Sequence, residues 1–170
     1  MFMKNFSKET DPIWIVILEN VRSAHNVGSV FRTADAAGVS QIHLLGYTPR
    51  PLDRFGRPVP ELIKTALGAH EYLPWSESDD GVVLVRSLQA QGVLVIAVEQ
   101  SEAASPLPAF QPPALQSIAY IFGNERDGVS PELCQQADQV VEIPMYGQKE
   151  SLNISVSVGV VLFHTHPDWR

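Results

Sequence analysis

The segment NVRSAHNVGSVFRTADAAGV, at positions 20–39, carries side chains that could bind a polar ligand. Asn20, Asn26 and Arg32 lie around Gly28 at the predicted start of a helix. A buried helix does not need so many side-chain hydrogen-bonding groups, because its backbone groups already pair with one another. We therefore expect these three residues to hold a ligand. The alternative for Arg32 is a surface ion pair with Asp35, three residues further along the helix.

Short apolar runs alternate with helical spacing along the chain, which is the pattern of strands alternating with helices. Strands are predicted over 13–18, 41–45, 92–98, 117–122 and 139–145, and helices over 27–37, the first half of 61–72, 81–92 and 131–137. Residues 46–60 contain four prolines and two glycines and are predicted to form a long loop.

The last segment, 151–166, is ambiguous, because its ISVSV alternation suits a strand while its length and small residues suit a helix. We favour the helix, because the preceding elements already alternate. The predicted fold class is α/β, with a mostly parallel sheet and helices on both faces.

Composition limits the classes of protein that the chain could represent. A length of 170 residues predicts a single domain, and no apolar run is long enough to span a bilayer. The start of the chain does not resemble a signal peptide, and a single cysteine, Cys134, favours a reducing compartment such as the cytoplasm. We expect no metal site, and we interpret the His164 and His166 pair as a solvated helix end.

Charge is distributed unevenly along the chain, whose net charge is −7. Between Asn20 and Lys64 there are six basic residues against three acidic ones, whereas residues 65–148 hold two basic against eleven acidic ones. This asymmetry predicts one electropositive patch on an acidic body, which is compatible with nucleic-acid binding.

Polar residues and glycines follow several predicted strands, at the sheet edge where α/β proteins bind ligands. They occur in ILENVRSAHNVG, IFGNERDG, IPMYGQKESLN and AVEQS. Neither a GxGxxG nor a GxxxxGK[ST] fingerprint is present. A Rossmann-like nucleotide enzyme, which the alternation alone would allow, therefore lacks its phosphate-binding loop.

Three of these loops resemble the motifs of the SpoU/TrmH family of the SPOUT superfamily, which are RNA ribose 2′-O-methyltransferases. The second and third motifs are IFGNERDGVS (121–130) and IPMYGQKESLNISVS (143–157), and residues 48–75 resemble the region between motifs in shorter members. The first motif is carried by Asn20, Asn26, Gly28, Arg32, Thr33, Ala34, Ala36 and Gly38.

The resemblance implies that the cofactor is S-adenosyl-L-methionine and the substrate RNA, either tRNA or rRNA. It also implies a SPOUT fold with a C-terminal trefoil knot, and a homodimer whose active site is completed across the interface. We expect one domain over 1–170 without a separate RNA-binding domain, so that substrate choice would come from the core and residues 46–64.

The resemblance also assigns roles to individual residues, although helix capping by Asn26 and Asn153 and a solvated turn at Glu125 remain alternatives. The implied catalytic residues are Arg32, Asn26, Glu125 and Asn153. The implied cofactor-binding residues are Val98, Glu99, Gly123, Ile143, Met145 and Leu152. The substrate-binding residues are Asn20, Arg22, Arg50, Arg54, Arg57, Lys64 and Ser151.

Arg32 matches the catalytic arginine of the family, and two roles are open to it. It could act as a base if a phosphate or Glu125 assisted loss of its proton. It could instead stay charged and stabilise the developing alkoxide, which we favour because guanidinium groups keep their proton at neutral pH. A further alternative is an RNA-binding module that has the fold without the activity.

Overall fold

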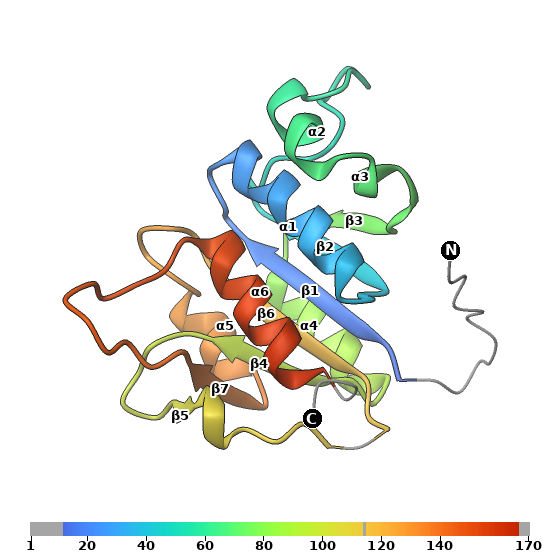
Figure 1. The fold of residues 1–170 in the computed structure, drawn as a ribbon. Helices are drawn as coiled ribbons and strands as arrows, with labels where there is room; N and C mark the ends of the chain where they lie inside the picture. The colour runs from blue at the N-terminus through green and yellow to red at the C-terminus, as the bar shows by residue number, and fades with distance from the viewer. Residues whose placement is uncertain (1–11, 114, 167–170) are drawn as a thin grey trace, which may run out of the picture.

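The computed structural model describes residues 12–113 and 115–166, which form one seven-stranded parallel sheet between two layers of helices (Figure 1). The strand order is β3-β2-β1-β6-β4-β7-β5. The strands are β1 (Trp14–Glu19), β2 (Gln41–Leu45), β3 (Trp75–Ser78), β4 (Leu94–Val98), β5 (Ser105–Pro106), β6 (Ile118–Phe122) and β7 (Gln139–Glu142). The predicted parallel sheet is confirmed.

Strand β1 lies inside the sheet because the first five residues of its sequence, WIVILE, are apolar on both faces. All six of its residues are buried. Val16 is in register with Ile42 on one side and with Tyr120 on the other. Continuous apolar character is what a strand needs when helices cover both faces of its sheet.

Helices cover both faces of the sheet, as predicted. The helices are α1 (Ala24–Ala36), α2 (Pro60–Ala66), α3 (Ala69–Tyr72), α4 (Gly81–Ala90), α5 (Pro131–Gln136) and α6 (Ile154–Thr165), with a 3₁₀ turn at Leu107–Ala109. Helices α1 and α6 lie side by side on one face, where Phe31 and Val158 share a core with Val16 (Figure 1). On the other face, Val85 of α4 and Leu133 of α5 pack with Ile17.

The last segment forms helix α6, as predicted, despite its alternating sequence. Its buried residues recur at helical spacing: Ile154, Val158, Val161, Leu162 and Thr165. Near the end of α6, the hydroxyl of Tyr120 donates to Thr165 at 3.0 Å, which ties the helix to β6. His164 is exposed, whereas the His166 ring packs against Trp14 with centroids 5.3 Å apart. The trefoil knot stays a prediction.

Several element boundaries differ from the predictions, each for a local reason. The helix expected over the first half of 61–72 is present as α2, which ends where Leu67 and Gly68 have left-handed backbone with φ of 47° and 90°. The short helix α3 after this break was not predicted. The strand expected over 139–145 ends at Glu142, since Pro144 cannot donate to a strand ladder. Strands β3 and β5 were not predicted, because WSES is polar and the second has only two residues. Within the described ranges, no helix is long and apolar enough to cross a membrane.

Helices α1 and α2 approach closely at Gly28. A Cβ atom at this position would lie 2.1 Å from both the Leu62 carbonyl oxygen and the Thr65 Oγ1 atom. The Thr65 hydroxyl also donates to the His25 carbonyl at 2.9 Å, so the two helices are joined directly. Gly28 therefore fixes the position of α2 against the first motif.

We predict that Gly28→Ala destabilises the protein, because the added methyl group meets backbone that cannot move freely. Overpacking of this kind costs about 1–3 kcal/mol of unfolding free energy. Urea denaturation at fixed protein concentration measures the change.

Gly159→Ala is the matched control, because Gly159 is also helical but its added Cβ would meet only Thr33 Cγ2, at 3.5 Å. Replacing a helical glycine with alanine normally leaves stability unchanged or raises it, by up to about 1 kcal/mol. Equal effects of the two substitutions would show that the close approach of the helices does not constrain Gly28.

Candidate active site

A cavity of about 350 Å³ lies at the carboxyl ends of β4, β6 and β7. We call it the strand-end cavity. Its walls come from the loops after these three strands and from the first turns of α6. All six predicted cofactor-binding residues line it: Val98, Glu99, Gly123, Ile143, Met145 and Leu152. Glu125 and Ser151, predicted for catalysis and substrate binding, line it too.

One wall of the strand-end cavity is a tight turn at 123–129. A Cβ atom on Gly123 would lie 1.8 Å from the carbonyl carbon of Gly128, so only glycine allows the two backbone segments to meet. Asn124 and Gly128 exchange two backbone hydrogen bonds of 3.1 Å. The Asn124 side chain also accepts from the amides of Arg126 and Asp127, both at 2.8 Å. The turn is therefore braced by its own hydrogen bonds, and residues 123–128 line the cavity.

Two carboxylates hold this turn in place from neighbouring strands. Glu19, at the end of β1, accepts from the amide of Ser130 at 2.8 Å. Glu99, after β4, accepts from the amide of Val129 at 2.7 Å. The role of Glu19 was not predicted from the sequence. Glu19 is buried, and a carboxylate at the end of an otherwise apolar strand is the pattern that could have indicated this role. Glu99 was predicted to bind the cofactor, and its described hydrogen bonds support the cavity wall.

Gln100 connects the wall after β4 to the loop that precedes α6. Its side-chain amide donates to the Glu150 carbonyl at 2.6 Å, and its backbone amide donates to Glu99 Oε1 at 2.9 Å. Both Gln100 and Glu150 line the strand-end cavity. Sequence analysis included Gln100 in the AVEQS loop without assigning it a role, because a contact across fifty residues leaves no local pattern.

A chain of polar side chains joins the three motifs beside the cavity. The Asn26 amide group donates to Glu125 Oε1 at 2.9 Å, and its own oxygen accepts from Asn153 Nδ2 at 3.2 Å. Asn153 in turn caps α6 by accepting from the Ser155 amide at 2.9 Å. At α1, the capping side chain is that of Ser23, so Asn26 does not have the capping role considered above.

Glu125 is held as a carboxylate by several donors. Burial would raise its pKa, but hydrogen bonds from the Asn26 side chain and from backbone amides outweigh burial and lower the pKa. Those amides include Arg22, at 3.1 Å, and Ser23, at 3.4 Å. Glu125 is therefore not a freely solvated turn residue, and it anchors the start of α1 to the second motif.

Arg32 does not reach the strand-end cavity within one copy of the chain. It is exposed on α1 and lines a second cavity of about 510 Å³, together with Ser29, Thr33, Ala36, Lys64, Thr65, Leu67 and Phe163. Asp35, the alternative partner for Arg32, accepts instead from the Tyr72 hydroxyl at 3.2 Å. The first motif thus contributes to two places: Asn26 binds Glu125, which lines the strand-end cavity, and Arg32 lines the second cavity.

The other predicted substrate residues are spread over several places. The Asn20 side chain accepts from the Tyr47 amide at 3.3 Å and braces the loop after β2. Arg50 forms an ion pair with Glu77 of β3. Arg54 and Arg57 lie over the Phe55 ring, and Lys64 lines the second cavity. Within the described ranges, no cluster of three or more His, Cys, Asp or Glu side chains could hold a metal ion.

A parallel sheet whose strand-end turns enclose a cavity defines a ligand-binding α/β protein. Residues 14–163 match the model of the SpoU rRNA Methylase family, and the chain belongs to this family. The resemblance drawn from the three motifs is thereby confirmed, and the Rossmann-like alternative is set aside.

Curated relatives of the chain are RNA methyltransferases. It is 32% identical over 156 residues to the 23S rRNA (guanosine-2′-O-)-methyltransferase RlmB of Neisseria meningitidis serogroup B, covering 92% of this chain and 59% of that protein. It is 33% identical to the tRNA (guanosine(18)-2′-O)-methyltransferase of Thermus thermophilus, covering 92% of this chain and 75% of that protein. The chain thus spans about three fifths to three quarters of these relatives' lengths.

Solved structures share the fold. An AdoMet-bound rRNA methyltransferase from Sinorhizobium meliloti superposes with a TM-score of 0.80 at 28% identity, covering 91% of this chain and 56% of that one. The A. aeolicus TrmH/SpoU tRNA modifying enzyme superposes with a TM-score of 0.77 at 27% identity, covering 92% and 74%. The predicted fold class is confirmed by these neighbours.

We predict that Glu125→Gln makes the protein less stable near neutral pH but not in acid. Because the folded-state pKa of Glu125 is lowered, its hydrogen bonds stabilise the fold fully above the ordinary value of 4.5. This contribution is lost as the pH falls below that value and the carboxylate is protonated. Unfolding free energies of both proteins, measured by urea denaturation from neutral to acid pH, give the difference.

The difference between the two proteins should shrink as the pH falls. A constant difference across the whole range would mean that the charge of Glu125 does not contribute to the anchoring of α1.

Proposed function

We propose that this protein is an S-adenosyl-L-methionine-dependent methyltransferase that modifies a ribose 2′-hydroxyl in tRNA or rRNA. The observation that carries the proposal is the strand-end cavity, whose walls include residues of the second and third family motifs. The printed functions of the relatives from Neisseria and Thermus support the reaction and the RNA substrate. We place the protein in the cytoplasm, which the single cysteine supports.

The strand-end cavity suits the proposed cofactor in size and in chemistry. Its volume of about 350 Å³ lies within the range of small-molecule sites. Ile143, Met145 and Leu152 provide apolar surface, while residues 123–128 of the turn provide polar surface. Such walls fit an adenosine and a methionine moiety, and the AdoMet-bound neighbour supports this assignment.

When bound, the cofactor would supply a methyl group on a sulfonium, which transfers without a metal ion. The protein must hold the ribose oxygen in line with that methyl carbon and stabilise the oxygen as its proton leaves. In this step the C–O bond forms, the C–S bond breaks and one proton is released.

The proposed role of Arg32 is to stabilise the developing alkoxide and to bind an adjacent phosphate. A guanidinium group suits both tasks because it stays charged and presents several donors in a fixed plane. Asn26, Glu125 and Asn153 would position the substrate-facing side of the cavity through their hydrogen-bonded chain.

Arg32 requires a second copy of the chain to act at a strand-end cavity, and we propose a homodimer. Helix α6 carries a row of exposed apolar residues beside Arg32, with Val156 49% and Val160 38% exposed. Phe163, one turn further along, lines the same hollow as Arg32. Burying this row against a second copy would stabilise a dimer and bring Arg32 of one protomer towards its partner.

We predict that Arg32→Ala strongly reduces methyl transfer while leaving cofactor binding intact. Radiolabelled S-adenosylmethionine and total RNA provide the assay, and nucleoside mass spectrometry identifies the 2′-O-methylated product. Loss of a charged transition-state contact costs on the order of 100-fold in turnover. Titration calorimetry should give the same cofactor affinity for both proteins.

Arg86→Ala is the control, since Arg86 lies on α4, on the opposite face, and donates to Gln136 at 3.2 Å. Equal turnover by Arg32→Ala and Arg86→Ala would remove Arg32 from the mechanism. RNA binding without any transfer by the unaltered protein would favour the non-catalytic module.

We predict that Gln100→Ala weakens cofactor binding, because it frees the loop before α6 from the β4 side of the cavity. Loss of one hydrogen bond of this kind should lower affinity about three- to ten-fold, raising the KM for the cofactor with little change in kcat.

Gln91→Ala is the matched control. The Gln91 side chain, at the C-cap of α4, donates to the Ser87 carbonyl at 3.0 Å, so its loss removes a similar bond away from the cavity. Cofactor affinities that are the same in both variants would mean that the Gln100 contact does not shape the site.

A further inference from the structure

The loop between β2 and α2 presents an aromatic ring to solvent. Phe55 is 66% exposed, so it contributes little to the core. The guanidinium carbon of Arg54 lies 4.7 Å from the ring centroid, and that of Arg57 lies 4.9 Å from it. We call Arg54, Phe55 and Arg57 the loop-tip cluster.

Asp53 builds this cluster into a fixed arrangement. Its carboxylate accepts from the amides of Phe55, at 2.8 Å, and Arg57, at 2.9 Å. The same carboxylate binds the Arg57 guanidinium at 2.8–2.9 Å, which holds that group beside the ring. These hydrogen bonds lower the pKa of Asp53, with the Arg57 amide as the largest cause. The exposed ring is therefore held in place before any partner binds.

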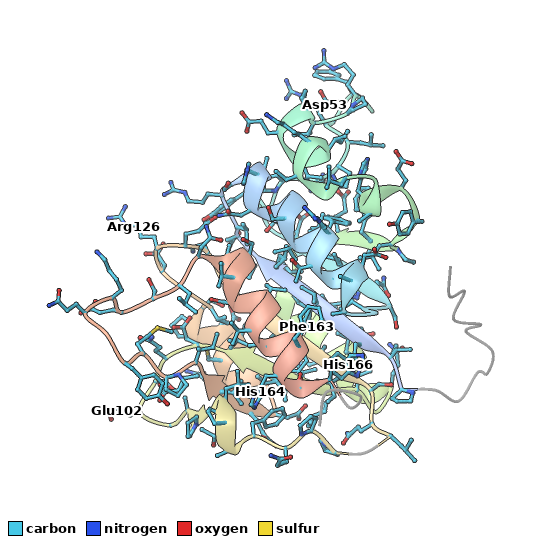
Figure 2. The ribbon with its side chains drawn as sticks, in the orientation of Figure 1. Asp53, Glu102, Arg126, Phe163, His164 and His166 are labelled. Atoms are coloured by element: carbon cyan, nitrogen blue, oxygen red, sulfur yellow. The ribbon has the colours of Figure 1, made fainter. Side chains whose placement is uncertain are left out.

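The base of the loop is tied to the fold as well. Leu52 and Pro58 form an antiparallel bridge, and the Val59 amide donates to the Pro51 carbonyl at 3.0 Å. Arg50 pairs with Glu77 on the edge strand β3. Figure 2 shows Asp53 at the end of the molecule beyond α2, whereas Arg126, which lines the strand-end cavity, lies on a different side. The loop-tip cluster is thus a surface separate from that cavity.

The chemistry of the cluster matches an unpaired nucleotide. Aromatic rings and guanidinium planes are the surfaces on which single-stranded bases stack. Residues 46–64 also hold four basic residues against two acidic ones, which favours a polyanion. A helical duplex keeps its bases stacked inside, so it offers phosphates but no base to such a ring.

We propose that the loop-tip cluster binds an unpaired nucleobase of the RNA substrate, with Phe55 as the stacking residue, away from the site of methyl transfer. This inference rests on the proposed function for the identity of the polymer. Arg54 and Arg57 were predicted to bind substrate, whereas no role was predicted for Phe55. The inference adds recognition of a base through Phe55.

The test compares a fluorescein-labelled RNA hairpin that has a single-stranded loop with a blunt duplex of the same stem, using fluorescence anisotropy. Phe55→Ala should weaken hairpin binding roughly ten-fold or more, because base stacking on an aromatic ring is lost. It should leave duplex binding and cofactor affinity unchanged. Phe55→Trp should retain hairpin binding, whereas Phe55→Leu, which keeps an apolar side chain without a π face, should not.

Tyr72→Ala removes another exposed aromatic ring and should leave hairpin binding unchanged. Equal hairpin affinity of Phe55→Ala and the unaltered protein would overturn this inference, as would an equal loss of duplex binding. Hairpin binding that depends on Phe55, without any methyl transfer to RNA, would uphold the inference and overturn the proposed function.

Discussion

The carboxylate of Glu125 is the interaction on which the arrangement of the three motifs depends. It accepts from the start of α1 and from the Asn26 side chain, which fixes the Asn26 amide with its nitrogen towards Glu125. The Asn26 oxygen must then accept, and its partner is Asn153. The Asn153 oxygen is left to cap α6. One negative charge thus sets the direction of two amides and the cap of α6, and it links Asn26 to Asn153, 127 residues further along the chain.

Sequence reasoning predicted the elements whose burial leaves a clear pattern. The apolar run of β1 and the helical spacing in α1 reflect packing on both sides of the sheet and on one side of a helix. The polar edge strand β3 was not predicted. It pairs with β2 at the edge of the sheet, and its four side chains are partly buried or exposed, so its sequence lacks an apolar pattern. Helix α3 was missed for another reason. It has four residues and follows the left-handed backbone of Leu67 and Gly68, and four residues are too few to show helical periodicity.

The residues of the candidate site that lie in the motifs could be predicted from the sequence. The contacts that hold those residues in place could not. Resemblance marked the residues that line the strand-end cavity, because motifs record residue types at fixed positions. Glu19 and Gln100 act on backbone groups far away in sequence, where any residue type provides the same amide or carbonyl. The separation of Asn26 from Arg32 follows from helix geometry. Six residues along a helix correspond to a rotation of roughly 240°, so one motif necessarily faces two directions.

The position of α6 has a consequence for how the protein is made. The strand-end cavity takes its last wall from Ile154 and Ser157, which follow every other wall residue in sequence. During synthesis, the sheet and the earlier turns leave the ribosome first. A nascent chain therefore has a nearly complete sheet before it has a closed cavity, and the cofactor meets a finished binding site only after translation has passed α6.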